Sequence, residues 1–265
     1  MQLCIRQLFL MIGGESGADI VPCHAAGDEG QGDLFGKASK QEFHCDKEDI
    51  AVMAGMHSAR GIDFSTLPPH AHRLFELSAN AFSAITHAWM SELPVTAEIV
   101  RFGRNILAAS TRHAADRIAT DRVNPDVQTV LEAAYKTRHE IHRLMGLLRF
   151  SPDEDGVYIA PCEPDHFILP ALGPHFMERF GETPWAIIDV KRRLCLRRDP
   201  GKPLNFFTLD DSNAGTETPQ TDEWEDLWRR YHKTINNESR NNPALQQQFM
   251  PKRYWKYLTE VAANR

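Results

Sequence analysis

The amino-acid sequence predicts an α+β protein with a helical N-terminal part, a small antiparallel sheet with a covering helix, and a helical C-terminus. The first observation behind this prediction is that apolar residues recur at three- and four-residue steps from Pro69 to Met145, the period of a helix face. The second is that short apolar runs separated by turn residues follow between 147 and 209. We expect one domain over 1–265, with a mainly helical part (1–135), a strand–strand–helix–strand–strand core (136–210) and C-terminal helices (211–265).

Helices dominate the region before the strands. The apolar run from Leu3 to Ile12 is too short to cross a membrane, and no small-residue cleavage site follows it cleanly. A buried amphipathic helix is therefore preferred there to a signal peptide. Further helices are predicted from Asp46 to Met56, Pro69 to Trp89, Pro94 to Ile106, and Pro125 onwards with Asn124 as N-cap.

Two hairpins are predicted to flank one helix in the core. The paired strands are Leu147–Phe150 with Val157–Cys162, and Pro184–Val190 with Leu194–Arg198, while Asn205–Leu209 adds an edge strand. The helix Ile168–Phe180 has one apolar face, with Asp165 as the expected N-cap and Gly181 at its end. Three C-terminal helices are expected, at Asp222–Asn236, from Pro243 and from Pro251.

Charge and cysteine content limit the possible functions. The formal net charge is −6, which excludes a uniformly basic nucleic-acid coat. The five cysteines form no CxxC pair, so neither a disulfide framework nor a zinc site is indicated, and a reducing cytoplasm is expected. Gly13–Gly14 lacks the Lys-Ser/Thr ending of a phosphate-binding loop. We therefore expect no cofactor and no membrane partner.

A group of polar residues at the junction of the third long helix and the first strand is the candidate catalytic site. Its members are a carboxylate pair and two imidazoles, Glu140, His142, Asp165 and His166, which suit general acid–base chemistry if the hairpin brings them together. Arg143 and Arg149 lie nearby and suit phosphate binding. The alternative is structural, with Asp165 as a helix cap and Glu140–Arg143 as a surface pair. His139 with His142 lacks the i,i+4 spacing of a helical zinc site, so no metal is predicted.

The second candidate site is basic and aromatic. After Trp228, eight Lys and Arg residues face only two Glu residues. The predicted nucleic-acid contacts are Arg229, Arg230, Lys252, Arg253, Tyr254, Trp255 and Lys256, since cations meet phosphates and aromatic rings stack on unpaired bases. The alternative is that the aromatic residues lie on the buried faces of their helices and the cations lie on the opposite, solvent-exposed faces. If Lys252, Arg253 and Lys256 all contact duplex phosphates, replacing them with Ala should flatten the log–log salt slope by about 2–3.

Four segments resemble an uncharacterised bacterial family that is usually labelled putative DNA repair or DNA metabolism protein. They are EIHRLMGLLRF (140–150), PDHFILPALGPHFMERF (164–180), LWRRYHKTI (227–235) and MPKRYWKYL (250–258). The resemblance covers roughly residues 125–260. It implies an association with a radical-SAM protein, because members tend to be encoded beside one, and some members are fused to a uracil-DNA glycosylase domain.

The resemblance and the charge pattern together lead to three hypotheses. The first is a nucleic-acid-binding component of DNA repair or DNA metabolism that binds DNA and acts with a radical-SAM partner. The second is an enzyme acting on a nucleic acid or nucleotide through the Glu140, His142, Asp165 and His166 set. The third is a protein-interaction adaptor without nucleic-acid contact.

Overall fold

The computed structural model describes residues 5–14, 64–65, 67–209 and 242–258, together with the single residues 227, 230 and 234. The described residues up to Tyr135 form one compact unit, and those from Lys136 onwards form another. Helices and a five-stranded mixed sheet make up the fold, which confirms the predicted α+β class. No helix within the described ranges is long and apolar enough to cross a membrane. The expectation of a single domain stays a prediction.

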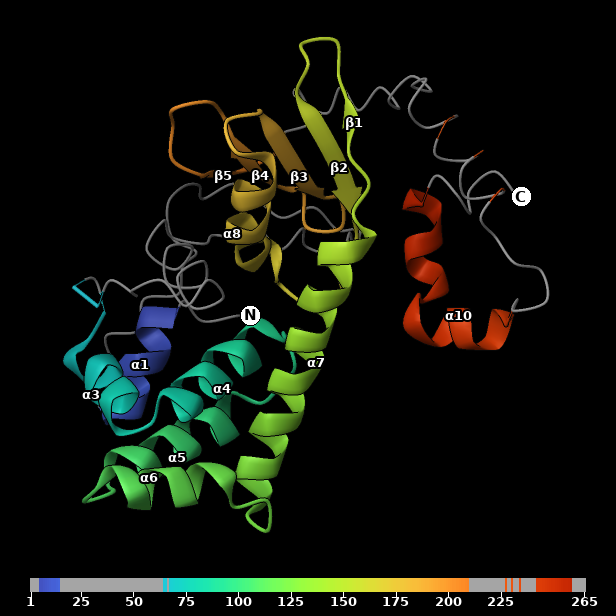
Figure 1. Cartoon of the computed structure of the whole chain (residues 1–265). Coiled ribbons are helices and arrows are strands. Elements are labelled where there is room, and N and C mark those ends of the chain that lie inside the picture. The colour runs from blue at the N-terminus through green and yellow to red at the C-terminus, as the bar shows by residue number, and fades with distance from the viewer. Residues whose placement is uncertain are drawn as a thin grey trace, which may run out of the picture. The chain divides into compact units, whose positions relative to one another are not determined.

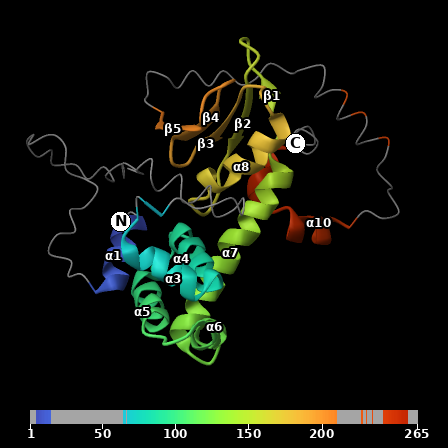
Figure 2. The ribbon, with the colours of Figure 1, turned by 60° about the vertical axis from the view of Figure 1, so that its left-hand side comes forward.

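The first unit is helical (Figures 1 and 2). Its helices are α1 (Ile5–Gly13), α3 (Pro69–Leu77), α4 (Ala79–Met90), α5 (Thr96–Leu107), α6 (Arg112–Thr120) and the first half of α7 (Pro125–Leu147). Phe9 of α1 stacks on Phe82 of α4 with ring centroids 5.3 Å apart. The close approach of α1 to α5 requires Gly103, because an added Cβ would lie 2.8 Å from the Ile12 side chain. The helix predicted at the N-terminus and the N-cap role of Asn124, whose Oδ1 accepts from Asp126 N at 2.9 Å, are both confirmed.

Ser78 breaks the helix that the sequence predicts from Pro69 to Trp89. Its backbone is extended, with φ −157° and ψ 103°, and its Oγ accepts a hydrogen bond from Ala81 N as the N-cap of α4. The same hydroxyl donates to Asp116 of α6 at 2.7 Å. Helix α6 is absent from the sequence-based prediction because only two alanines of it are buried, which leaves no apolar period to read.

The second unit is built on the sheet, with strands in the order β1 (Ser151–Pro152), β2 (Tyr158–Cys162), β3 (Trp185–Asp189), β4 (Leu194–Arg198) and β5 (Asn205–Thr208). Helix α8 (Leu169–Phe180) covers one face of it (Figure 1). Buried Leu172 and Phe176 lie on the inner side of α8, and the Phe176 ring lies 6.1 Å from that of Trp185 on β3. The β3–β4 hairpin, the edge strand β5 and the packing of α8 on the sheet confirm their predictions.

Two details of the predicted sheet are wrong. The sheet is mixed, because β2 and β3 pair in parallel, with Tyr158 opposite Trp185. The reason is that α8 lies between these strands in sequence and carries the chain back to the starting edge, as a crossover connection does. The first strand is Ser151–Pro152 and not Leu147–Phe150, because α7 continues to Leu147 and Leu148 N still donates to Leu144 O. Asp153 closes the following turn by accepting from Val157 N at 2.7 Å.

After the sheet, α10 (Pro243–Phe249) and the 3-10 helix η3 (Lys252–Tyr257) follow the two prolines as predicted. Segment η3 lies against β2. The helix predicted at Asp46–Met56 lies outside the described residues, and so does most of the one predicted at Asp222–Asn236. This arrangement brings α7, the loop after β2, the β3–β4 turn and η3 to one end of the second unit.

Candidate functional site

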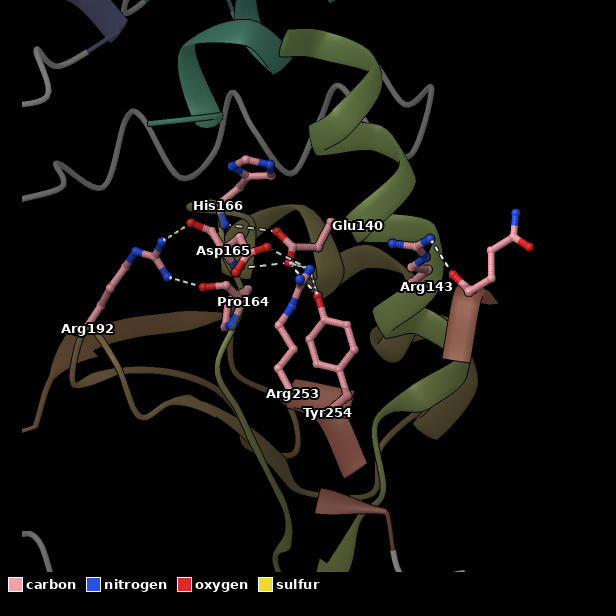
Figure 3. A network of polar contacts seen from close by, with 9 residues as sticks. Glu140, Arg143, Pro164, Asp165, His166, Arg192, Arg253 and Tyr254 are labelled. Carbon is pink, nitrogen blue, oxygen red and sulfur yellow. Dashed lines mark hydrogen bonds and ion pairs between the residues drawn. The ribbon is translucent and has the colours of Figure 1, made fainter. Parts of the chain in front are cut away.

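Glu140 of α7 is the centre of a polar network at this end of the second unit (Figure 3). Its side chain is buried, with 4% exposed, and its two carboxylate oxygens accept from Asp165 N at 2.8 Å and His166 N at 2.9 Å. A buried carboxylate requires such donors, since an unpaired buried charge costs several kcal/mol. The Glu140 side chain therefore holds the loop between β2 and α8 through the backbone N–H groups of that loop.

Segment η3 adds two further donors to the same carboxylate. The Tyr254 hydroxyl, in a residue that is 2% exposed, donates to Glu140 at 2.5 Å. Burial, followed by the charge of Glu140, raises the pKa of Tyr254, so its hydroxyl keeps its proton and acts as a donor. The guanidinium of Arg253 lies 3.4 Å from Glu140, 2.7 Å from Asp165 and 2.9 Å from the Tyr254 oxygen. Three of these contacts go to Oε1 and one goes to Oε2, so the carboxylate is held both by η3 and by the loop after β2.

Arg192, in the β3–β4 turn, holds the other side of the loop. It forms a buried ion pair with Asp189 at 2.7 Å, the two side chains being 3% and 0% exposed. The same guanidinium donates to the carbonyl oxygens of Pro164 at 3.0 Å and Asp165 at 2.9 Å. Figure 3 shows Arg192 and Glu140 reaching the loop from opposite sides. The loop is thus anchored through its N–H groups by Glu140 and through its carbonyl groups by Arg192.

Glu163 extends the network at the start of the loop. It accepts from Lys256 Nζ at 2.6 Å and from the Tyr257 hydroxyl at 2.8 Å, both on η3. These two hydrogen bonds, that of Lys256 first, lower the pKa of Glu163, and burial raises the pKa of Tyr257. Two carboxylates of the loop, Glu163 and Asp165, therefore pair with two cations of η3, which fastens η3 to the sheet end of the unit.

The candidate catalytic residues are brought together only in part. Glu140, Asp165 and the backbone of His166 converge, but the contacts drawn to His166 in Figure 3 involve its backbone nitrogen and not its imidazole ring. His142 is exposed on α7, two positions after Glu140, and residues two apart on a helix do not face each other. Asp165 is not the N-cap of α8, which is Ile168. No group of three or more possible metal ligands occurs in the part of the chain that the structure describes.

The predicted nucleic-acid contacts differ in their surroundings. Tyr254 is buried and Trp255 donates its indole N–H to Met250 O at 2.8 Å, while Arg253 and Lys256 are paired with carboxylates. Lys252 and Arg230 are exposed. Arg149 donates to the carbonyls of Gly146 and Leu148 at the end of α7, and Arg143 donates to Gln248 O at 3.1 Å. Arg229 lies outside the described residues.

Sequence reasoning missed four members of the network, Glu163, Asp189, Arg192 and Tyr257. A signal existed for Asp189, because a carboxylate that directly follows the apolar run WAII needs a buried partner, and the nearby KRR offers one. No comparable signal pointed to Glu163 or Tyr257, whose partners are more than 90 positions away in the chain.

The fold and the network define an α+β protein with a five-stranded mixed sheet. Its segment η3 is fastened by half-exposed charge pairs and by the buried hydrogen bond from Tyr254 to Glu140. Residues 99–260 match the model of DUF4130, a domain of unknown function, and the chain belongs to this family. No curated protein and no solved structure matches the chain.

Proposed function

We propose that the protein is a nucleic-acid-binding component of DNA repair or DNA metabolism that acts together with a radical-SAM enzyme. The family resemblance of the four C-terminal segments supports the biological setting. The geometry favours binding over catalysis, because the carboxylate at the centre of the polar network is buried and already accepts hydrogen bonds from four donors within the protein.

The observation that carries the proposal is the presentation of cations by η3. Tyr254 anchors this segment in the interior, while Lys252 is exposed and the side chains of Arg253 and Lys256 remain 41% and 46% exposed. The ammonium of Lys252 lies 6.0 Å from the centre of the Trp255 ring. An exposed cation beside an aromatic ring suits a phosphate and its neighbouring base.

The test is a titration of the full chain against fluorescein-labelled single-stranded and duplex DNA, followed by fluorescence anisotropy at several salt concentrations. We expect binding at low salt. The logarithm of the association constant should fall linearly with the logarithm of the salt concentration, because phosphate contacts release counterions. Lys252→Ala should lower the slope by about 0.9 on duplex DNA, the value for one phosphate contact. Lys202→Ala is the matched control, since Lys202 is also an exposed lysine of the second unit.

A parent protein that binds neither DNA at low salt would overturn the proposal and favour the adaptor hypothesis. The partnership is tested separately by mixing the chain with a radical-SAM enzyme encoded beside it and measuring co-elution in size-exclusion chromatography. Separate elution at micromolar concentrations would remove the partner from the proposal and leave DNA binding in place.

A further inference from the structure

The second half of α7 carries a group of cations and imidazoles that differs from the other charged clusters of the second unit. Its members, hereafter the α7 cationic face, are Lys136, Arg138, His139, His142 and Arg143. Each lies three or four positions from another, so the five form one continuous strip along the helix. Thr137, Ile141 and Leu144 are buried and take the opposite side of α7.

The strip is open to solvent. Lys136, Arg138 and His142 are exposed, and His139 and Arg143 are half-buried. The only carboxylate between them in sequence, Glu140, is buried and turned into the network with Tyr254 and Arg253. The face is therefore cationic without an acidic residue of its own.

Within the described ranges, no ion pair balances the lysine and arginine charges of the face. Among the residues that the structure describes, neither Lys136, Arg138 nor Arg143 forms an ion pair with a carboxylate. Burial, followed by the positive charges of Arg143 and His142, lowers the pKa of His139, so cations rather than carboxylates dominate its surroundings. Like charges held together in this way repel each other, and an external polyanion would relieve that repulsion.

The clusters on η3 provide the contrast. Arg253 is 2.7 Å from Asp165 and Lys256 is 2.6 Å from Glu163, so a phosphate would have to compete with a carboxylate for either cation. On α7, within the part of the chain that the structure describes, no carboxylate forms an ion pair with Lys136, Arg138 or Arg143, and exposed Glu132 lies one turn before Lys136. The guanidinium of Arg143 also donates to Gln248 O at 3.1 Å, which brings the end of α10 beside the face. Exposed Lys252 follows α10 in the sequence.

We propose that the α7 cationic face is the principal contact surface for the phosphate backbone of a nucleic acid. This inference rests on the proposed function and names the site that serves it. Lys136 and Arg138 supply the permanent charges, and Arg143 adds a guanidinium whose planar donors match phosphate oxygens. His142 can donate a ring N–H to a phosphate oxygen.

The deciding experiment compares two charge-matched double variants of the full chain. In Lys136→Gln/Arg138→Gln the face loses two exposed cations, and in Arg112→Gln/Arg117→Gln two exposed cations are removed from α6. Glutamine is a good helix former, so both variants should unfold within a few degrees of the parent in a thermal scan. Anisotropy titrations with labelled duplex and single-stranded DNA are run on the parent and on both variants.

We expect the α7 double variant to lower the salt slope by about 1.8 on duplex DNA or about 1.4 on a single strand, two contacts in each case. Between about 50 and about 200 mM salt, a slope lower by about 1.8 amounts to roughly a tenfold smaller loss of affinity. The α6 control should keep the parent's slope. Equal slopes for parent and α7 variant, with binding intact, would overturn this inference while leaving the proposed function standing.

The two other outcomes are also informative. A parent that binds no DNA would overturn the proposed function itself and the inference with it. Competition by poly-glutamate as effective as that by unlabelled DNA, charge for charge, would show that the face takes an acidic polypeptide and would likewise contradict the nucleic-acid assignment.

Discussion

The hydroxyl of Tyr254 donates a hydrogen bond of 2.5 Å to the carboxylate of Glu140, which lies 114 positions earlier in the chain. Both residues are nearly inaccessible to solvent, with 2% and 3% exposed. The same carboxylate holds the loop after β2, so one buried charge joins a helix, a loop and the C-terminal segment. The stability of η3 therefore depends on Glu140.

Tyr254→Phe should destabilise the second unit by about 1 kcal/mol, because it removes one hydrogen bond and leaves Glu140 its three other donors. Glu140→Gln should cost more, about 3 kcal/mol, because its NH2 group would face the N–H of either Asp165 or His166, and only its one oxygen could still accept. Urea denaturation followed by circular dichroism measures both. Tyr158→Phe, which removes a half-buried phenol from β2, is the control for losing a phenol from the second unit. A Glu140→Gln variant as stable as the parent would contradict the central role of this carboxylate.

Arg192→Met should destabilise the protein by about 3–5 kcal/mol, because it leaves the fully buried Asp189 without its cation. Arg197→Met, which breaks the more exposed pair with Asp199, should cost only about 0–1 kcal/mol. The measurement is the free energy of unfolding in urea for each variant. If Arg192→Met does not fold, Arg192→Lys keeps the charge and loses the planar fork that reaches Pro164 and Asp165. If Arg192→Met, or Arg192→Lys in its place, were as stable as Arg197→Met, the buried pair would have no special structural role.

The pair of Glu163 and Lys256 should stabilise the fold in a pH-dependent way. The folded protein lowers the pKa of Glu163, so its contribution is present above the ordinary Glu value of about 4.3 and is lost as pH falls through the folded pKa. Lys256→Met should therefore lower the free energy of unfolding by about 0.5 kcal/mol at neutral pH, the magnitude typical of half-exposed pairs. At about pH 3 the same substitution should lower it by less.

Urea denaturation of parent and Lys256→Met at both pH values gives this difference. The same substitution in a Glu163→Gln background is the control and should show little dependence on pH, because the titrating partner is absent. A cost that stays constant down to about pH 3 would show that the ion pair does not contribute to stability.

Local patterns determined most of the secondary structure. The helical period of apolar residues predicted α4, α5, α7 and α8. Proline or capping residues predicted where α7, α10 and η3 begin. The breaks were harder to predict. Ser78 ends one helix and starts another because its hydroxyl reaches Asp116, 38 positions away, and no local pattern contains that partner.

The sheet illustrates the same division between local and distant information. Strand positions β2 to β5 follow from runs of β-forming residues and turn signals, which are local. The parallel pairing of β2 with β3 depends on how α8 packs, since a crossover and a hairpin differ in the path of the connecting chain and not in the strands themselves.

The candidate site depended on the tertiary structure most of all. The sequence alone determined that Glu140, Asp165, Arg253 and Tyr254 are present and that α7 has a polar side. Only the fold decided that Glu140 turns inward, that Arg253 and Lys256 acquire carboxylate partners, and that Lys136, Arg138 and Arg143 form no ion pair among the described residues. The physical reason is that a charge is neutralised by whichever opposite charge the fold brings within about 4 Å, and these partners lie about a hundred positions apart along the chain.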